Sequence, residues 1–263
     1  MKHVKVAILR TAGTNCDNET AFAFLLAGAE PDLVHINEFV KKRKRLSDYH
    51  ILALPGGFTY GDDIASGKVL ANEIKYKLQG DTERFISEGK LIIGICNGFQ
   101  ILAKMGLLPA LGGRLWDVDI TLNLNDSAKF EDRWCYLKKA ERSNCVWTKG
   151  ASSIIYLPVA HGEGKFIPKD ETILKKLKEN HQIAFRYCAK GGGRAGYPGN
   201  PNGSIDDIAA VSDSTGRILG MMPHPERHVV VTQHPRWTRE KLDKDGDGIL
   251  IFRNGVDLVK ANL

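Results

Sequence analysis

Apolar runs alternate with segments of helical periodicity along the first hundred residues of the chain. Four continuous apolar runs are typical of strands buried on both faces of a parallel sheet. They lie at residues 4–9, 33–36, 51–54 and 91–95. Helical patterns lie at residues 18–27, 67–78, 82–87 and 99–104. This alternation of strands and helices predicts an α/β fold with a parallel sheet.

The pattern changes after residue 114. Apolar and polar residues alternate there, as in residues 117–122, which predicts antiparallel strands within 114–156, packed beside the main sheet. Further strands are expected at 183–187, 208–211 and 218–222, and a terminal helix at 249–259. No Pro- or Ser-rich linker divides the chain, so residues 1–263 are expected to form one domain. We predict a flavodoxin-like three-layer sandwich, with a mostly parallel sheet and an added antiparallel section.

The segment Gly94-Ile95-Cys96-Asn97-Gly98 lies where a predicted strand is followed by a predicted helix. In this context, two glycines flanking a nucleophile form a nucleophile elbow, a turn so tight that side chains at the glycines would clash. The elbow places the Cys96 thiol at a helix N-terminus, which favours the thiolate. A buried structural cysteine is the alternative. The glycine spacing favours a reactive cysteine.

A cysteine nucleophile needs a base, and His224 is the candidate. It lies in Pro223-His224-Pro225-Glu226, after the apolar run 218–222. The two prolines restrict the backbone around His224, and Glu226 can accept a hydrogen bond from its far ring nitrogen, as the third member of a triad does. A polar surface turn is the alternative for this motif in isolation. Together with the elbow, the catalytic interpretation is the better one.

Attack by Cys96 on a carbonyl would create an oxyanion, which preorganised backbone N–H groups stabilise. The Asn97 N–H directly follows the nucleophile and is one expected donor. The turn Pro55-Gly56-Gly57 follows the predicted strand 51–54, and the Gly57 N–H is the expected second donor. Taken alone, this turn would be an ordinary connection between a strand and a loop.

These three motifs, in this order, resemble those of the class I (triad) glutamine amidotransferases. Residues 10–17, 56–62 and 200–204 (RTAGTNCD, GGFTYGD and NPNGS) are similar to the glutaminase subunits of phosphoribosylformylglycinamidine synthases. The resemblance extends from about residue 4 to residue 254. It implies that residues 1–263 form one glutamine amidotransferase type 1 domain, which hydrolyses L-glutamine and passes ammonia to a synthetase subunit in de novo purine biosynthesis.

The resemblance also implies a role for individual residues. Cys96 would be the nucleophile, His224 the general base and acid, and Glu226 the residue that orients His224. Gln100 lies one helical turn after the elbow on the same face. By the same resemblance, its side chain would contact the substrate amino acid.

The glutamine-binding loop of the family corresponds to residues 161–166. The resemblance therefore implies substrate contacts from His161, Gly162, Glu163 and Gly164, mainly through the backbone. His161 is expected to shape this loop rather than to act as an acid, a base or a metal ligand.

Amidine formation requires activation of the acceptor oxygen, normally by phosphorylation. The sequence contains no G-x-x-x-x-G-K-[ST] motif, so we expect no cofactor and no metal on this chain. The resemblance implies that ATP and Mg²⁺ bind to the synthetase subunit, and that a small third subunit often joins the complex. The alternatives are a class I amidotransferase of another pathway, a cysteine hydrolase on a related elbow fold, and a non-enzymatic module. Residues 200–204 disfavour the first, and the intact triad disfavours the last.

The cysteine content and the lack of long apolar runs indicate the cellular compartment of the protein. Five cysteines without a C-x-x-C pair argue against a disulfide framework and against a zinc cluster. No apolar run approaches the roughly 20 residues that span a bilayer, and the chain enters a predicted strand without room for a signal peptide. We expect a cytoplasmic protein that contacts no membrane.

Two charged segments suggest further binding sites. Residues 41–45 (KKRKR) contribute to a net charge of +6, but no aromatic residues interleave with them, so a solvated loop or a docking patch for an acidic partner is expected rather than nucleic-acid binding. Residues 243–248 (DKDGDG) match the start of an EF-hand loop, but its twelfth position is Asn254, which cannot act as a bidentate carboxylate. A structural turn is expected there.

Overall fold

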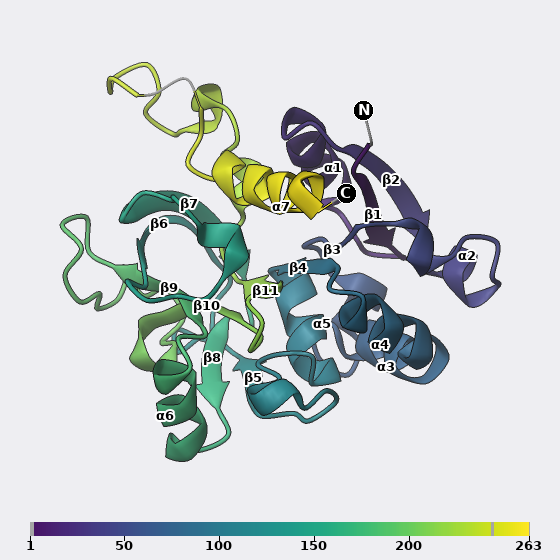
Figure 1. Ribbon diagram of the computed structural model, residues 1–263. Helices are drawn as coiled ribbons and strands as arrows, with labels where there is room; N and C mark the ends of the chain where they lie inside the picture. Colours follow the sequence, from purple (N-terminus) through teal and green to yellow (C-terminus); the bar gives the residue numbers. More distant parts are fainter. Residues whose placement is uncertain (1–2, 243–244, 263) are drawn as a thin grey trace.

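A mixed β-sheet forms the centre of the computed structural model, which describes residues 3–242 and 245–262 (Figure 1). Within those residues, nine strands pair in the order β2-β1-β3-β4-β11-β10-β9-β6-β7. Their bounds are β1 Lys5–Arg10, β2 Glu30–His35, β3 Ile51–Leu54, β4 Leu91–Ile95, β6 Glu131–Lys139, β7 Ile154–His161, β9 Ile183–Cys188, β10 Ile208–Ser212 and β11 Ile218–Met221. The strands from β2 to β11 run parallel, and each later strand is antiparallel to its neighbour.

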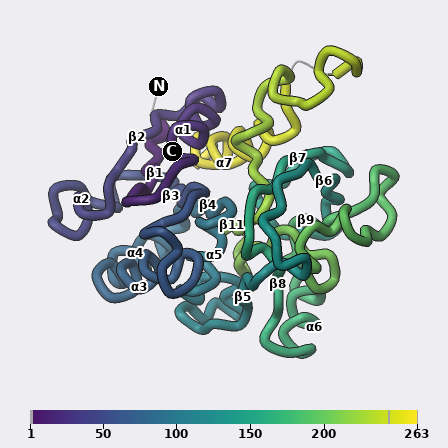
Figure 2. The backbone as a smooth tube through the Cα atoms, turned by 180° about the vertical axis from the view of Figure 1, so that it is seen from behind, coloured from purple at the N-terminus to yellow at the C-terminus, as the bar shows by residue number. Residues whose placement is uncertain are grey.

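Helices cover both faces of the parallel half of the sheet. α1 (Asp17–Leu26) and α7 (Ile249–Asn262) pack together on one face (Figures 1 and 2), where Phe24 meets Phe252 edge to face at 5.0 Å. α3 (Lys68–Lys77), α4 (Gln79–Ser87) and α5 (Asn97–Met105) lie on the other. Every residue of β3 and β4 is buried, as strands covered on both faces require. The predicted α/β sandwich is confirmed.

The expected placement of the antiparallel strands was partly wrong. β6 and β7 do not pack beside the main sheet but extend it, because β6 pairs with β9. β5 (Ile120–Asn123) lies outside that sheet and pairs with β8 (Lys165–Pro168). An alternating pattern shows that one face of a strand is buried, but it does not identify the strand beside it.

The sequence pattern also left some elements unpredicted. They are β8, the short helix α2 (Ile36–Val40) and the helix α6 (Glu171–Glu179). The α6 helix has a clear start signal, since the Asp170 carboxylate accepts a hydrogen bond from the Ile173 N–H at 2.9 Å.

The two charged segments make local contacts. In the run 41–45, Arg43, Lys44 and Arg45 pair with Glu38, Asp32 and Asp48, as expected for a solvated loop. Asp243 and Lys244 lie outside the described residues.

The rest of the EF-hand-like segment is held by the protein itself. Asp245 pairs with Arg253, and the Asp247 carboxylate accepts from the Tyr156 N–H at 2.7 Å. Both acids therefore fasten the turn that precedes α7. Across the described ranges, no helix is both long and apolar enough to cross a membrane.

The packing of α5 against β3 depends on Gly98. A Cβ atom at this position would overlap the carbonyl oxygen of Leu54. The close approach places the N-terminus of α5 directly beside the end of β3, so the loops after β3 and β4 meet.

Gly98→Ala is expected to lower the free energy of unfolding by roughly 1–3 kcal/mol, because the added methyl forces the backbone of β3 or α5 to shift. The matched control is Gly80→Ala in α4, where an added Cβ meets nothing within 4 Å. That variant should be neutral or slightly stabilising. Urea unfolding of both variants measures the difference, and equal stabilities would contradict the packing argument.

Candidate active site

Cys96 lies at the backbone reversal between β4 and α5. Its φ of +52° and ψ of −105° are values that residues with side chains rarely adopt, and such strain is concentrated at functional sites. The Cys96 N–H donates to the Met221 carbonyl at 2.8 Å, which ties the turn to the end of β11. The thiol is almost fully buried, with Sγ 3.6 Å from the Ala160 carbonyl oxygen. The turn has the geometry expected of a nucleophile elbow.

His224 and Glu226 follow β11, the strand beside β4. His224 Nδ1 donates to Glu226 Oε1 at 2.6 Å, and both side chains are buried. The His224 N–H donates to the Pro158 carbonyl at 2.8 Å, so the backbone as well as the ring is held in place. Nε2 makes no hydrogen bond within the described part of the chain. The ring therefore has one oriented nitrogen and one nitrogen free for proton transfer.

The charge of His224 is set by its neighbours. Burial alone would lower the pKa of His224, but the negative charges of Glu226 and Cys96 outweigh it and hold this pKa well above its ordinary value. The imidazolium form is therefore favoured, and it is the form that stabilises a neighbouring thiolate.

The loop after β3 is braced by the segment 10–17. Gly57 has φ +143°, and a Cβ there would lie 2.7 Å from the Gly13 carbonyl oxygen, so the position requires glycine. Phe58 N–H donates to the same Gly13 oxygen at 2.9 Å, and Cys16 N–H donates to the Gly56 oxygen at 3.2 Å. These bonds tie the Gly57 peptide to the segment 10–17.

His161 is a structural residue of the predicted glutamine loop. Its Nδ1 donates to Asn125 Oδ1 at 3.1 Å, and Asn202 Nδ2 lies 3.4 Å from Nε2. Burial, helped by the positive charge of His224, lowers the pKa of His161 to about 3, so the ring is neutral. Asn125 Oδ1 also accepts the Gly164 N–H at 3.0 Å. The expectation that His161 shapes the loop agrees with these contacts.

Gln100 lies where the sequence predicts it, one turn after Cys96, but its amide is engaged by the protein. Nε2 donates to the Glu163 carbonyl at 2.5 Å, and Oε1 accepts from Asn97 Nδ2 at 3.0 Å. The side chain ties the 161–164 loop to the elbow helix. Gly162 and Glu163 remain partly exposed. Their contact with glutamine, like that of Gln100, stays a prediction.

Sequence reasoning missed the role of Cys16. Ligand-type atoms of Cys16, His224 and Glu226 lie within 4.8 Å of one another, so a second thiol adjoins the candidate triad. Arg227 Nη2 donates to Cys16 Sγ at 3.1 Å. Because the Cys16 thiol lies beside the Arg227 cation, we interpret Cys16 as packing beside the candidate triad rather than as a metal ligand.

Two residues in the loop after Gly57 were missed as well. Thr59 and Asp62 both bond to the side chain of Asn97. The motif GGFTYGD in residues 56–62 was the available signal, but it marks the family without showing which of its side chains reach the elbow.

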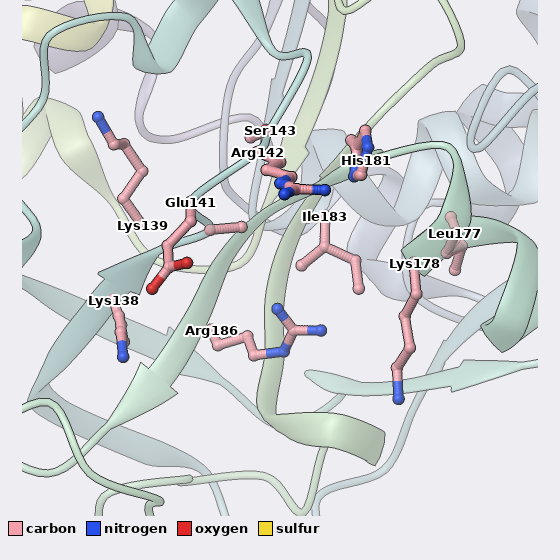
Figure 3. Close-up of a pocket in the computed structure, with 11 residues that line it drawn as sticks. Lys138, Lys139, Glu141, Arg142, Ser143, Leu177, Lys178, His181, Ile183 and Arg186 are labelled. Atoms are coloured by element: carbon pink, nitrogen blue, oxygen red, sulfur yellow. The ribbon is translucent and has the colours of Figure 1, made fainter.

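A cavity of about 360 Å³ lies between the end of β6 and the start of β9 (Figure 3). Its lining is rich in cations, namely Lys138, Lys139, Arg142, Lys178 and Arg186, and it also includes His181. Asp206 pairs with Lys178 at 3.2 Å and with Arg186 at 2.8 Å, so part of this charge is balanced within the protein. The cavity is separated from Cys96 by the length of the strands.

The chain is similar to known proteins along nearly its whole length. The CobB/CobQ-like glutamine amidotransferase domain family matches residues 3–259. The chain is 51% identical to the phosphoribosylformylglycinamidine synthase subunit PurQ of Dehalococcoides mccartyi, covering 97% of this chain and 98% of that protein. It is 43% identical to the subunit of the same name from Methanococcus maripaludis, covering 96% of each.

A solved structure agrees with these relatives. The structure of PurLQS from Thermotoga maritima contains a chain that matches with a TM-score of 0.74 and 30% identity, covering 98% of this chain and 100% of that one. The resemblance predicted from residues 10–17, 56–62 and 200–204 is thereby confirmed, and the chain belongs to the PurQ family of phosphoribosylformylglycinamidine synthase subunits.

Proposed function

We propose that this protein is the glutaminase subunit of a phosphoribosylformylglycinamidine synthase. It hydrolyses L-glutamine to glutamate and ammonia. The ammonia then serves the ATP-dependent conversion of formylglycinamide ribonucleotide to formylglycinamidine ribonucleotide in de novo purine biosynthesis. The observation that carries the proposal is the buried His224–Glu226 pair beside a strained Cys96 elbow, in a chain of the PurQ family.

In the first half of the reaction, Cys96 Sγ attacks the side-chain carbonyl carbon of glutamine and a C–S bond forms. The carbonyl oxygen becomes an oxyanion that accepts hydrogen bonds from the Gly57 and Asn97 N–H groups, each worth about 10²–10³ in rate. The His224 imidazolium gives its Nε2 proton to the leaving nitrogen. The C–N bond breaks, ammonia leaves, and a γ-glutamyl thioester remains on Cys96.

In the second half, neutral His224 takes a proton from water, and the hydroxide attacks the thioester carbon. The C–S bond breaks, glutamate leaves, and the Cys96 thiolate and the His224 imidazolium are restored. Glu226 holds the Nδ1–H in both halves at 2.6 Å, which keeps Nε2 directed at the reacting atoms.

The proposal includes a cytoplasmic complex and one amidotransferase domain over residues 1–263. The synthetase subunit would bind ATP and Mg²⁺ together with the nucleotide acceptor, and a small third subunit would complete the assembly. The similarity to a chain of PurLQS supports the association with a synthetase. The proposal places no cofactor and no metal on this chain.

Cys96→Ala is expected to abolish glutamine-dependent amidine formation in the complex while ammonia-dependent formation survives, because ammonia bypasses the thioester. A glutamine-analogue alkylator should label Cys96 alone in the wild type. Cys135 and Cys145 should stay unlabelled, since burial raises the pKa of each thiol to about 12. Peptide mapping that places the label on Cys16 instead, with Cys96 untouched, would overturn the assignment.

His224→Asn is expected to lower kcat for glutamine hydrolysis by about 10²–10⁴, the usual contribution of a positioned acid–base group. Glu226→Gln should cost less, because Glu226 orients the base without handling the transferred proton. Circular dichroism checks that both variants fold. Near-wild-type turnover in His224→Asn would show that another group acts as the base.

The isolated chain should hydrolyse glutamine slowly. The synthetase subunit, with nucleotide and acceptor bound, should raise the rate of this hydrolysis about 10²-fold. Stimulation of this size needs only about 2.7 kcal/mol of preferential binding to the competent arrangement. Phe58 is 44% exposed and Ile64 88% exposed, so the loop that carries Gly57 is accessible to a partner. Steady-state glutamate release with and without the partner tests this. Equal rates would refute the coupling but not the triad.

A further inference from the structure

The side chain of Asn97 connects the segments that surround Cys96. Its Oδ1 accepts two hydrogen bonds from Thr59, from the N–H at 3.3 Å and from Oγ1 at 2.7 Å. Its Nδ2 donates to Asp62 Oδ1 at 3.1 Å and to Gln100 Oε1 at 3.0 Å. The side chain is fully buried, so no water can replace these partners. We call this set of four hydrogen bonds the Asn97 bridge.

The Asn97 bridge spans the two expected oxyanion donors. One donor is the backbone N–H of Asn97 itself, and Thr59 lies two residues after Gly57, which carries the other. An amide side chain has nearly the same shape when its oxygen and nitrogen are exchanged, so its orientation is decided by its neighbours. Here the two acceptors on the nitrogen side, from Asp62 and Gln100, direct the oxygen toward Thr59.

Asp62 is itself firmly held. Its Oδ1 accepts the Gly67 N–H at 3.3 Å, and Oδ2 accepts from Ser66 Oγ at 2.9 Å. Tyr60 and Asp62 have left-handed backbones with φ of +54° and +55°, so this loop adopts a conformation that needs support from side chains. The carboxylate supplies that support by anchoring both its own loop and the elbow residue.

The bridge continues to the far side of the site. Gln100, which accepts from Asn97, also donates to the Glu163 carbonyl in the predicted glutamine loop. A single chain of hydrogen bonds thus links the loop after β3, the elbow helix and the loop after β7.

We propose that Asp62 is a positioning residue of the glutaminase reaction, which acts through the Asn97 bridge to hold the Gly57 and Asn97 N–H groups at a fixed separation. The role rests on the proposed function, because it concerns the oxyanion of that reaction. Asp62 contributes as a hydrogen-bond acceptor and not through proton transfer. Its effect is therefore on kcat, since the oxyanion exists in the transition state and not in bound glutamine.

The test compares Asp62→Ala with Asp62→Asn in the complex with the synthetase. Asp62→Ala should lower kcat for glutamine by about 10–10²-fold, which is less than the loss of a whole donor. KM should change less than about threefold, and ammonia-dependent formation should be unchanged. Asp62→Asn keeps the Oδ1 acceptor and should restore kcat to within about threefold of wild type.

Asp63→Ala is the matched control, because Asp63 is the next residue on the same loop and is exposed. It should leave kcat unchanged. Asn97→Ala retains the backbone N–H but removes the bridge. Adding Asp62→Ala to that variant should therefore lower kcat less than twofold further, since the proposed effect of Asp62 on kcat passes through the Asn97 bridge.

Each outcome decides the proposal. Unchanged kcat in Asp62→Ala, equal losses in Asp62→Ala and Asp62→Asn, or multiplying losses in the double variant would overturn it. If Asp62→Ala does not fold, Thr59→Val removes a donor at the other end of the bridge and should lower kcat with the same unchanged KM. Cys96→Ala in the same assay separates the two hypotheses, because glutamine-dependent activity there would refute the proposed function instead.

Discussion

The arrangement of the site depends on the backbone reversal at Cys96. A residue with a side chain at φ +52° costs on the order of 1–3 kcal/mol and persists only where its surroundings enforce it. Two contacts do so here: the hydrogen bond from Cys96 N–H to Met221, and the approach of α5 to β3 that Gly98 permits. Because β4 pairs with β3 on one side and β11 on the other, the segments that carry Gly57 and His224 follow the two strands that flank the Cys96 turn.

The antiparallel half of the sheet contributes further contacts to the residues around Cys96. β7 supplies the Pro158 carbonyl that holds the His224 backbone and the Ala160 carbonyl that lies against Cys96 Sγ. The loop after β7 carries Glu163, which Gln100 binds. The parallel strands therefore position the candidate triad residues, and the antiparallel strand β7 contributes contacts around them.

Local sequence signals predicted most of the fold, and they singled out the candidate residues Cys96, His224 and Glu226, whose catalytic roles stay a prediction. The apolar runs identified β1, β3, β4 and β11 because strands buried on both faces leave a continuous pattern, and the glycines around Cys96 marked its turn. The pairing of β6 with β9 could not be inferred, since it joins residues about 50 positions apart without a local signal. The positions of Asp62 and Cys16 beside the site could not be predicted for the same reason, because they depend on side-chain contacts between separate loops.

Because the Asn97 side-chain amide is hydrogen-bonded through both its oxygen and its nitrogen, few substitutions are tolerated at position 97 or at the positions that bond to it. A different residue at position 97 would leave Asp62 and Thr59 without their partner, and a residue at position 62 that cannot accept a hydrogen bond would leave a buried N–H group unsatisfied. Single changes at either position are thus costly, whereas a simultaneous change can replace one complementary pair by another. Although positions 62 and 97 lie 35 residues apart, substitutions at one should be accompanied by substitutions at the other among related sequences. The exposed neighbour Asp63 should accept substitutions independently of both.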